Sequence, residues 1–560
     1  MTGLSADTIQ CELRDPNLVM RLERMGSFHQ CRLSFMRTLL RKLKRENWRF
    51  ERPVFDIDDK GVGVAVYSAY GPVDTYSLVC FAHDLPADQR SDRVIAHAWD
   101  STFALFKGVP TQADIDRLEQ NVPRQEAGRV SQSEVSLSRA NRSVRLFEHV
   151  VSKLAAGEQP DQKQIDDVGY LMRTTAVYGS GKFGAADHSE GALPFQTEML
   201  SVALTRAYTL DLVEHMARTR APETAVVVEP KLRRRFGVGN STGLGMAPFI
   251  VNHPVLLNNW ISARETALAR VRSIASVADA ERAQFKNLLA RAMLNADNWH
   301  SAHEIQIEKL KLLKADLKTL SDHVNAGALE GNSPWDRLYN WSESNLSVEG
   351  QEQLVSLMLE PYGALVDELT DTMGADEGAS FGIDGAKSVG ETKAVLKDAF
   401  GWALGEDWKQ RESVARVWYV SEEKLEPRLG ERFEEPIEPY EQPLAPARDA
   451  VRMFEDMKSW EDDDTLAAFL LKFPEHRHVA RRAQIVAKFP YAEIRDNTIA
   501  SKMLPIDLLR CKLSFFGATH FDPRSDRWVR ITMFQNAPFP HEIADMNEDD
   551  WSYPELEGVG

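Results

Sequence analysis

The chain has 560 residues, of which 43% are hydrophobic and 27% are charged, and its formal net charge at pH 7 is -17. This length exceeds what one compact core accommodates, so about three or four folding units are expected, and the ordinary hydrophobic content excludes long-range disorder. The acidic balance repels phosphate backbones and anionic lipids, so we expect neither a nucleic-acid partner nor a membrane partner.

Two features of the sequence indicate a soluble protein of the cytoplasm. Residues 1–16 lack the basic region and apolar run of a secretory signal, and no uncharged apolar stretch approaches the roughly 20 residues of a membrane-spanning helix. The four cysteines form no CxxC pair, which favours buried, reduced thiols over a disulfide framework or a zinc site. They are Cys11, Cys31, Cys80 and Cys511.

Residues 1–110 predict a domain in which helices cover a small sheet. Apolar residues recur at helical spacing over 16–44, and a further helix is expected over 93–106. Between them lie three short runs rich in Val, Phe and Tyr, separated by turn sequences: 50–57, 63–70 and 75–82. These runs predict a three-stranded antiparallel meander.

Residues 111–420 predict a helical core. The helices are expected over residues 133–155, 164–174, 195–218, 255–276, 278–326, 354–373 and 388–404. Long helices cannot bury an apolar stripe alone, so they predict a central bundle, and they are the surface through which we expect any homo-oligomer to form. The arginines at 124, 129, 139, 142 and 145 form a basic cluster, expected either to pair with acidic helices or to assist in holding an anion.

Residues 421–447 are dense in Glu and Pro and predict an extended connector. Residues 448–560 are then expected to form a helical and mixed subdomain, with a strand pair over 512–519 and 528–534 and an acidic tail. The fold class predicted from the whole pattern is mainly α with a small antiparallel β-sheet near the N-terminus, an α+β arrangement around a central long-helix bundle.

The first of two glycine-rich, cation-bearing loops has the sequence RTTAVYGSGKFG over residues 173–184. The phosphate-loop spacing GxxxxGK[ST] is absent, because no glycine stands five residues before Gly181 and Phe183 occupies the Ser/Thr position. Glycines still let backbone N–H groups converge, and a cation adds charge. The residues expected to bind ligand are Arg173, Gly179 and Gly181, and the candidate catalytic residues are Lys182, Tyr178 and His188, whose carboxylate neighbours favour acid-base chemistry.

The second loop places three arginines, 233–235, beside the glycine-rich sequence GVGNSTGLG over residues 237–245. Guanidinium forks and backbone donors suit a carboxylate or a phosphate. The residues expected to bind it are Arg234, Arg235, Gly239, Asn240, Ser241 and Thr242. The alternative is a glycine-rich turn with arginines on the surface.

Residues 239–254 end in MAPFIVNHP ahead of a long helix. This stretch resembles the serine-bearing flexible loop of the fumarase and aspartase lyases, which also precedes a long helix. The resemblance implies a lyase of fumarase-like bundle architecture as an alternative. The stretch has no lysine between Met246 and Pro254 and no paired serines, so no catalytic role is carried over.

Asp297, His300 and Glu304 share a helical stripe, with His303 beside it, but no HExxH motif accompanies them, so no metal site is predicted.

Two functions of different classes remain open. The first is a cytosolic enzyme acting on a small anionic metabolite, phosphorylated or carboxylated, where the two glycine-rich loops meet; the sequence specifies neither its reaction nor a cofactor. The second is a noncatalytic helical scaffold whose acidic connector and arginine-rich helix bind protein partners.

Overall fold

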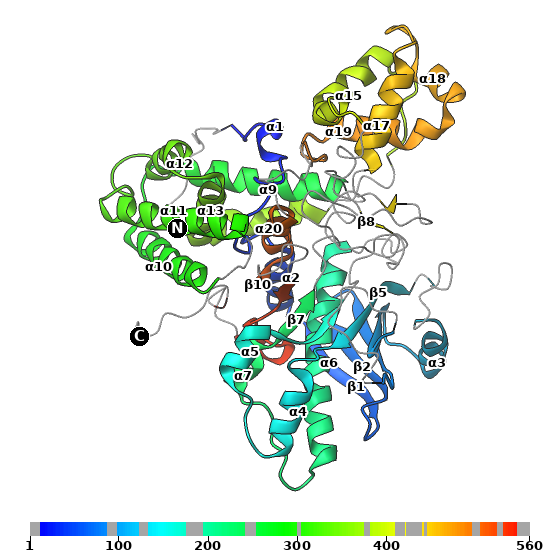
Figure 1. Ribbon diagram of the computed structural model, residues 1–560, viewed down its shortest axis with the longest axis vertical. Helices are drawn as coiled ribbons and strands as arrows, with labels where there is room; N and C mark the ends of the chain where they lie inside the picture. The colour runs from blue at the N-terminus through cyan, green and yellow to red at the C-terminus, as the bar shows by residue number, and fades with distance from the viewer. Residues whose placement is uncertain are drawn as a thin grey trace.

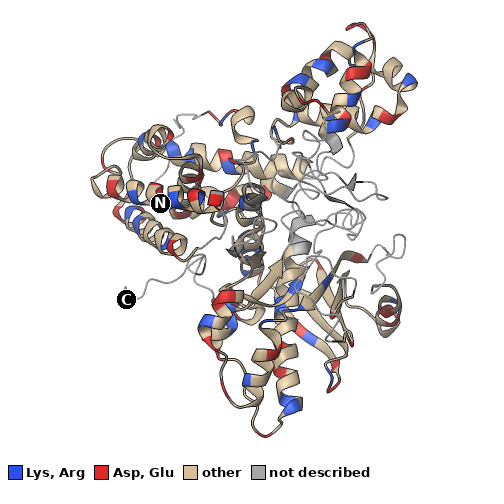
Figure 2. Ribbon diagram, in the orientation of Figure 1, with Lys and Arg blue, Asp and Glu red and all other residues tan. Residues whose placement is uncertain are grey.

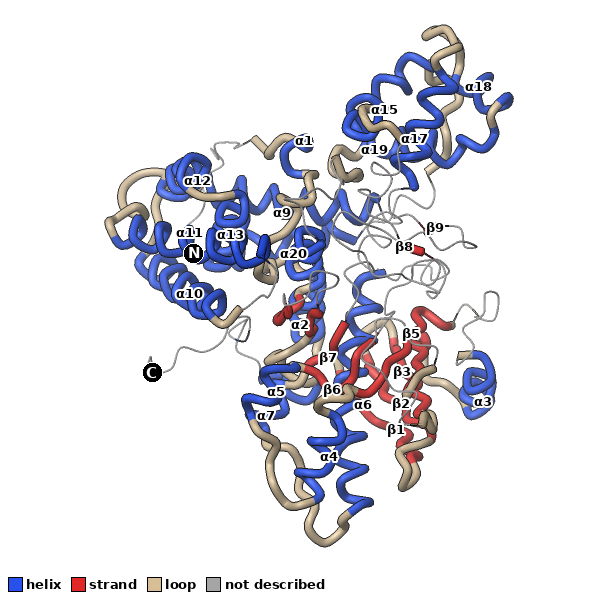
Figure 3. Tube along the Cα trace, viewed as in Figure 1, coloured by secondary structure: helices blue, strands red, loops and turns tan. Residues whose placement is uncertain are grey.

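The computed structural model describes residues 12–86, 98–122, 131, 133–174, 194–240, 254–299, 304–374, 381–408, 420–421, 440–441, 445–495, 505–522, 530–545 and 551. Three regions are visible in Figure 1 and Figure 3: one built around a sheet, one made of helices, and a separate group of helices formed by residues 381–408 and 445–495.

A nine-stranded sheet dominates the first region, with the order β1-β2-β3-β4-β5-β6-β7-β11-β10. Its strands are β1 (Arg49–Ile57), β2 (Gly63–Tyr70), β3 (Thr75–Ala82), β4 (Ser101–Lys107), β5 (Glu134–Arg142), β6 (Tyr170–Thr174), β7 (Gly237–Asn240), β10 (Ala518–Asp522) and β11 (Arg530–Met533). The predicted meander forms β1 to β3, but the prediction of a small antiparallel sheet is wrong, because these strands are only one side of a larger mixed sheet. The sheet also continues across residue 110, where the sequence placed a domain boundary.

The sheet is stepped between β5 and β6. β5 pairs with β4 from Glu134, opposite Phe106, to Ala140, opposite Ser101. β6 pairs only with the last three residues of β5, where Thr174 lies opposite Ala140. The carboxyl end of β6 therefore points along the flank of β5. Within the described sheet, β6 and β7 are the parallel pair, and the other neighbouring strands are antiparallel.

Three predicted helices are replaced wholly or partly by strands. Residues 93–106 include most of β4, residues 133–155 contain β5 followed by α4 (Phe147–Ala155), and residues 164–174 contain the end of α5 (Gln162–Val168) followed by β6. Both faces of these strands are buried, so the apolar runs of β4 and β6 lack the polar face that distinguishes a surface strand. In a strand, Arg139 and Arg142 are three residues apart and therefore lie on opposite faces.

Each face of the sheet is covered by helices. On one face α6 (Pro194–Arg220) packs against several strands, and the ring of Tyr208 lies 5.6 Å from Phe103 and 6.3 Å from Tyr67. On the other face α3 (Gln112–Asn121) brings Ile115 and Leu118 into a smaller apolar cluster with the outward side of β2 to β5. This double cover explains why β3 is apolar almost throughout.

The second region is helical. It contains α9 (Pro254–Arg272), α10 (Asp279–Asp297), α11 (Glu304–Asn325), α12 (Pro334–Asn345), α13 (Val348–Leu359), η3 (Glu360–Tyr362), α14 (Gly363–Val366) and η4 (Asp367–Gly374). The helix predicted over 278–326 is therefore two helices, α10 and α11, which pack against each other. α13 lies against α9, α10, α11 and α12, and every residue from Glu349 to Leu359 is buried.

The two ends of the chain join these regions. α1 (Pro16–Val19) and α2 (Phe35–Arg45) come from the N-terminal part, and α20 (Pro505–Phe516) and η6 (Pro540–Asp545) come from the C-terminal part. The segment before α2 crosses α20 so closely that a Cβ on Gly26 would lie less than 3.0 Å from the carbonyl oxygen of Arg510. Phe35 and Trp260 both pack against Phe515, which places α2, α9 and α20 around one core.

The separate group contains α15 (Val389–Leu404), α17 (Ala445–Met457), α18 (Leu466–Lys472), η5 (Pro474–His476) and α19 (Arg477–Lys488). α15 packs against α17 and α19, so this group is built from both sides of the connector expected over 421–447. Between them, β8 (Val420–Ser421) and β9 (Tyr440–Glu441) form a short antiparallel pair.

Charges of both signs are interspersed over the helices of all three regions, as Figure 2 shows. Across the part of the chain that the structure describes, no helix has both the length and the apolar character that crossing a bilayer requires.

Candidate functional site

The carboxyl ends of β6 and β7 lie side by side, with Arg173 opposite Gly239 and Thr174 opposite Asn240. Beyond Thr174 the sequence continues into the first glycine-rich stretch and reaches α6. Beyond Asn240 it continues into the second stretch and reaches α9. Since α6 connects two parallel strands, the arrangement is a βαβ unit. In such units ligands bind beyond the carboxyl ends of the strands.

The residues at these two strand ends are polar and buried. Arg173, Thr174 and Asn240 are all 1–2% exposed. Tyr170 stands at the amino end of β6 and Thr174 at its carboxyl end. Neither of their hydroxyl groups makes a hydrogen bond to any described residue. The carboxyl end of β6 therefore carries one hydroxyl, that of Thr174, which the described packing does not use.

Two glycines of the second stretch are explained by close packing. A Cβ on Gly239 would lie 2.6 Å from the ring of Tyr170, and one on Gly237 would meet the carbonyl oxygen of Met533. These glycines allow β7 to lie tightly between β6 and β11. Their presence thus has a structural cause in addition to any role with a ligand.

Arg234 and Arg235 lie elsewhere, at the end of α7 (Pro230–Arg235) and before the amino end of β7. Arg234 Nε is 3.2 Å from Glu542 Oε2, and Arg235 Nη1 is 2.9 Å from Asp166 Oδ2. Both side chains are partly exposed, and each already has a carboxylate partner. The structure does not bring them to the carboxyl ends of β6 and β7.

Arg206 of α6 fixes this amino end of β7. Its guanidinium donates to the carbonyl oxygens of Phe236 (2.6 Å), Arg234 (2.9 Å) and Ala537 (2.8 Å), and it stacks on Phe539. Burial lowers the pKa of Arg206 to about 9, since the carbonyl partners carry no full charge. This buried arginine has a structural role that joins three segments of backbone.

The remaining predicted site residues lie outside the described residues: Tyr178, Gly179, Gly181, Lys182, His188, Ser241 and Thr242. The same holds for His300 and His303 of the histidine stripe, and for the arginines at 124 and 129. Among the residues that the structure does describe, no group of three or more His, Cys, Asp or Glu side chains is placed to hold a metal ion.

A polar stripe along the buried helix α13 was not predicted from the sequence. The stripe consists of residues spaced three or four apart, which therefore share one helix face. They are Glu349, Glu352, Gln353 and Ser356, with Glu360 continuing the spacing into η3. All five are less than 10% exposed. We call this set the α13 stripe.

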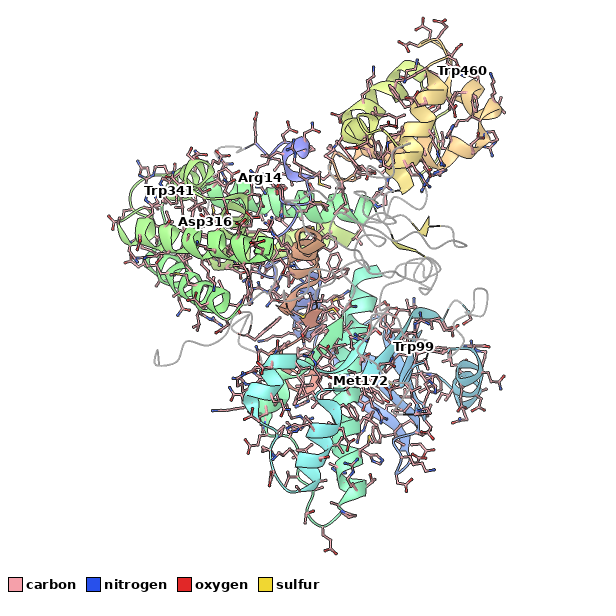
Figure 4. The ribbon with its side chains drawn as sticks, viewed as in Figure 1. Arg14, Trp99, Met172, Asp316, Trp341 and Trp460 are labelled. Carbon is pink, nitrogen blue, oxygen red and sulfur yellow. The ribbon has the colours of Figure 1, made fainter. Side chains whose placement is uncertain are left out.

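Glu352 and the neighbouring helix α9 share one arginine from the N-terminal segment. Arg14 donates from Nη1 to Glu352 (2.8 Å) and from Nε to Glu265 (2.7 Å), and Arg264 lies 3.0 Å from Glu265. Figure 4 shows Arg14 in the same helical region as Asp316 of α11. Burial would raise the pKa of Glu265, but the charges of the two arginines outweigh this effect and the pKa is lowered.

The middle of the stripe is joined to both ends of the chain by hydroxyl groups. The hydroxyls of Ser27 and Ser356 are 2.8 Å apart, and those of Ser27 and Ser514 are 3.1 Å apart. Ser27 precedes α2 and Ser514 belongs to α20. Three segments distant in the sequence therefore meet through hydrogen bonds in the core.

Glu360 accepts two hydrogen bonds from Arg37, of 2.6 and 2.7 Å, and lies 3.5 Å from His29 Nε2. Burial would raise the pKa of the Glu360 carboxyl, but Arg37 and His29 outweigh burial and hold the pKa well below its ordinary value. Burial lowers the pKa of His29. The guanidinium of Arg37 therefore favours the anionic form of Glu360, which is a poor arrangement for a general base.

At the start of the stripe, Glu349 accepts a hydrogen bond of 2.8 Å from Lys309 and lies 3.7 Å from Arg510. Burial would raise its pKa, but the charges of Arg510 and Lys309 lower the pKa of Glu349 to about 2. Each carboxylate of the α13 stripe thus has a cationic partner. This pairing favours a role in fastening residues 14–37 and 510–514 to α13 over a role in catalysis.

A signal for the stripe is present in the sequence, since polar residues recur at helical spacing within an otherwise apolar helix. That signal does not identify the partners, which lie more than a hundred residues away for most pairs. Comparison of the chain with protein families, with curated proteins and with solved structures gives no match.

Proposed function

We propose that the protein is an enzyme that binds a small anionic metabolite, carrying a carboxylate or a phosphate, beyond the carboxyl ends of β6 and β7. One observation supports this proposal above the others: the two glycine-rich sequences continue from neighbouring ends of parallel strands, opposite one another at Thr174 and Asn240. Glycine-rich segments between a strand and a helix are a common way of holding anions.

The roles follow from the chemistry of each residue. Lys182 would supply a positive charge to the anion, and the backbone of Gly179 and Gly181 would supply N–H donors. The buried hydroxyl of Thr174 and the side chain of Asn240 stand at the base of this site. His188 or Tyr178 would move the proton, because their side chains titrate or donate near a bound substrate.

We also infer a cytoplasmic location. Cys31, Cys80 and Cys511 are buried and form no disulfide within the described residues. Reduced, buried thiols are typical of proteins in a reducing compartment.

A ligand screen with three variants tests the proposed function. Phosphorylated and carboxylated metabolites are added to the full chain, and binding is read as a rise in melting temperature and then by calorimetry. The Lys182→Gln change is expected to weaken binding about tenfold or more, because a charge-assisted hydrogen bond contributes about 1.5–3 kcal/mol.

Two changes serve as controls. Lys163 lies on α5, is exposed and pairs with Asp167, so Lys163→Gln removes the same charge elsewhere. Arg235→Gln removes a cation from the amino end of β7. Both are expected to leave the affinity unchanged. The proposal fails if no metabolite of either class binds, or if Lys182→Gln binds as well as Lys163→Gln.

A further inference from the structure

A pocket lies between α1, α15 and the end of α19, away from β6 and β7. It has a volume of about 310 Å³. Its walls include Pro16, Val395, Val486 and Pro490, with Asp398 and Arg495 as its charged residues. This volume is at the lower end of the range of about 300–1,000 Å³ for small-molecule sites, which favours a ligand of amino-acid size over a nucleotide.

Arg495 is the residue that points to a ligand. Its side chain is only 6% exposed, and Nη1 lies 3.0 Å from Asp398 Oδ2. Nη2 makes one long contact of 3.5 Å with the carbonyl oxygen of Pro490. Nε makes no hydrogen bond to any residue that the structure describes, and the partner of Nη1 among these residues is the carboxylate of Asp398. Burying a guanidinium whose donors make no hydrogen bonds costs free energy, unless a further acceptor binds to those donors.

The backbone holds this arginine in place. The N–H of Arg495 donates to the carbonyl oxygen of Met20, which follows α1. Asp398 stands on α15 and its side chain is 58% exposed, so it is free to turn toward a bound cation while Arg495 stays fixed. The pocket therefore offers one fixed cation, one adjustable anion and an apolar wall.

We propose that this pocket binds a free aliphatic α-amino acid. The carboxylate of the ligand would accept hydrogen bonds from Arg495, its ammonium group would pair with Asp398, and its side chain would lie against Val395 and Val486. A zwitterion matches the paired charges of the pocket. Asp398 would repel a simple carboxylate, and Arg495 would repel a simple protonated amine. This inference rests on other residues than the proposed function, so either one can be wrong without affecting the other.

The test is a titration of the full chain with L-leucine, 4-methylpentanoate and 3-methylbutylamine, followed by calorimetry. These probes share an aliphatic body and carry both charges, the carboxylate alone and the ammonium alone. Leucine is expected to bind at least about tenfold more tightly than either single-charge probe, since each lost charge-assisted contact is worth about that factor.

Variants locate the binding. Asp398→Asn, at an exposed position, is expected to weaken leucine binding about tenfold or more, and Arg495→Lys is expected to weaken it as well because an ammonium cannot reproduce the fork. Asp463→Asn, an exposed residue of the same helical group, is the matched control and should bind leucine normally. Lys182→Gln should also bind it normally.

Three results would overturn the inference: no binding of leucine at millimolar concentration, equal binding of leucine and 4-methylpentanoate, or wild-type affinity in Asp398→Asn. Asp398→Asn keeps the test valid even if Arg495→Lys does not fold.

Discussion

At the scale of single residues, the core is held by charged groups whose partners come from distant parts of the chain. Glu349 illustrates the physics, because it faces Lys309 on α11 and Arg510 on α20, with Asp316 of α11 nearby. Removing one member of such a buried pair leaves the other charges without compensation. The stability lost is larger than the stability that the intact pair contributes relative to neutral residues in the same places.

We predict that Glu349→Gln lowers the free energy of unfolding at pH 7 by about 3 kcal/mol and flattens its acid dependence. The pKa of Glu349 is lowered from 4.5 to about 2 in the folded protein, so its contribution is fully present above pH 4.5 and is lost as the pH falls toward 2. Over that window this group gives a slope of up to about 1.4 kcal/mol per pH unit. Urea denaturation at several pH values measures it.

Glu455→Gln is the control for that measurement, because Glu455 is exposed and pairs with Lys458, three residues further along the chain. Its stability curve should run parallel to that of the unchanged protein. If the free energy of unfolding of Glu349→Gln fell with decreasing pH as steeply as that of the unchanged protein, the lowered pKa of Glu349 would be contradicted.

At the scale of elements, the crossing of α20 over the segment before α2 depends on a missing side chain. We predict that Gly26→Ala destabilises the protein by at least about 3 kcal/mol, because the new Cβ meets the backbone of Arg510 and Cys511, which cannot turn aside. Thermal or urea denaturation monitored by circular dichroism measures the change.

Gly401→Ala makes the same substitution where there is room. Gly401 lies in α15 directly after the kink at Phe400, and a Cβ there would meet nothing within 4 Å. Alanine is the better helix former, so this change is expected to stabilise by about 0.5–1 kcal/mol. If the two substitutions had equal effects, the close crossing would not be the cause.

The elements also show where local pattern is sufficient. β1, β2 and β3 were predicted correctly, because polar turns such as the one at Asp58 separate runs of β-branched and aromatic residues. β5 was predicted as a helix, although Val135 and Leu137 alternate with Ser136 and Ser138 at the period of a strand. β6 is a short, wholly buried run, and its periodicity cannot be told from that of a buried helix segment.

The candidate site was predicted only in part. The sequence singled out the two glycine-rich stretches, and the structure places the strands that lead into them side by side. The sequence could not show that Arg234 and Arg235 precede β7 and pair with Glu542 and Asp166, because these partners are about seventy to three hundred residues away. Nor could it show the partners of the α13 stripe or its burial, because the residues of the stripe have the composition of an ordinary solvent-facing helix side.

At the scale of the whole molecule, the C-terminal part completes structures that the N-terminal part begins. β11 pairs with β7 on one side and with β10 on the other, so residues from the far end of the chain form one edge of the sheet. α20 brings Arg510 to Glu349 and Ser514 to Ser27. The chain therefore has few places where it can be cut without exposing a sheet edge or a buried charge.

We predict that a chain ending at residue 504 has no cooperative thermal transition. Without β11 and β10, β7 becomes an edge strand with unpaired backbone groups, and without α20 the carboxylate of Glu349 loses Arg510 while Phe35 and Trp260 lose Phe515. A chain ending at residue 551 keeps every described element and should melt as the full chain does. Scanning calorimetry and near-ultraviolet circular dichroism compare the two. A sheet and a core that depend on residues 505–545 cannot persist once those residues are removed. A cooperative transition of the shorter chain within a few degrees of that of the full chain would therefore contradict this dependence and show that the N-terminal part folds alone.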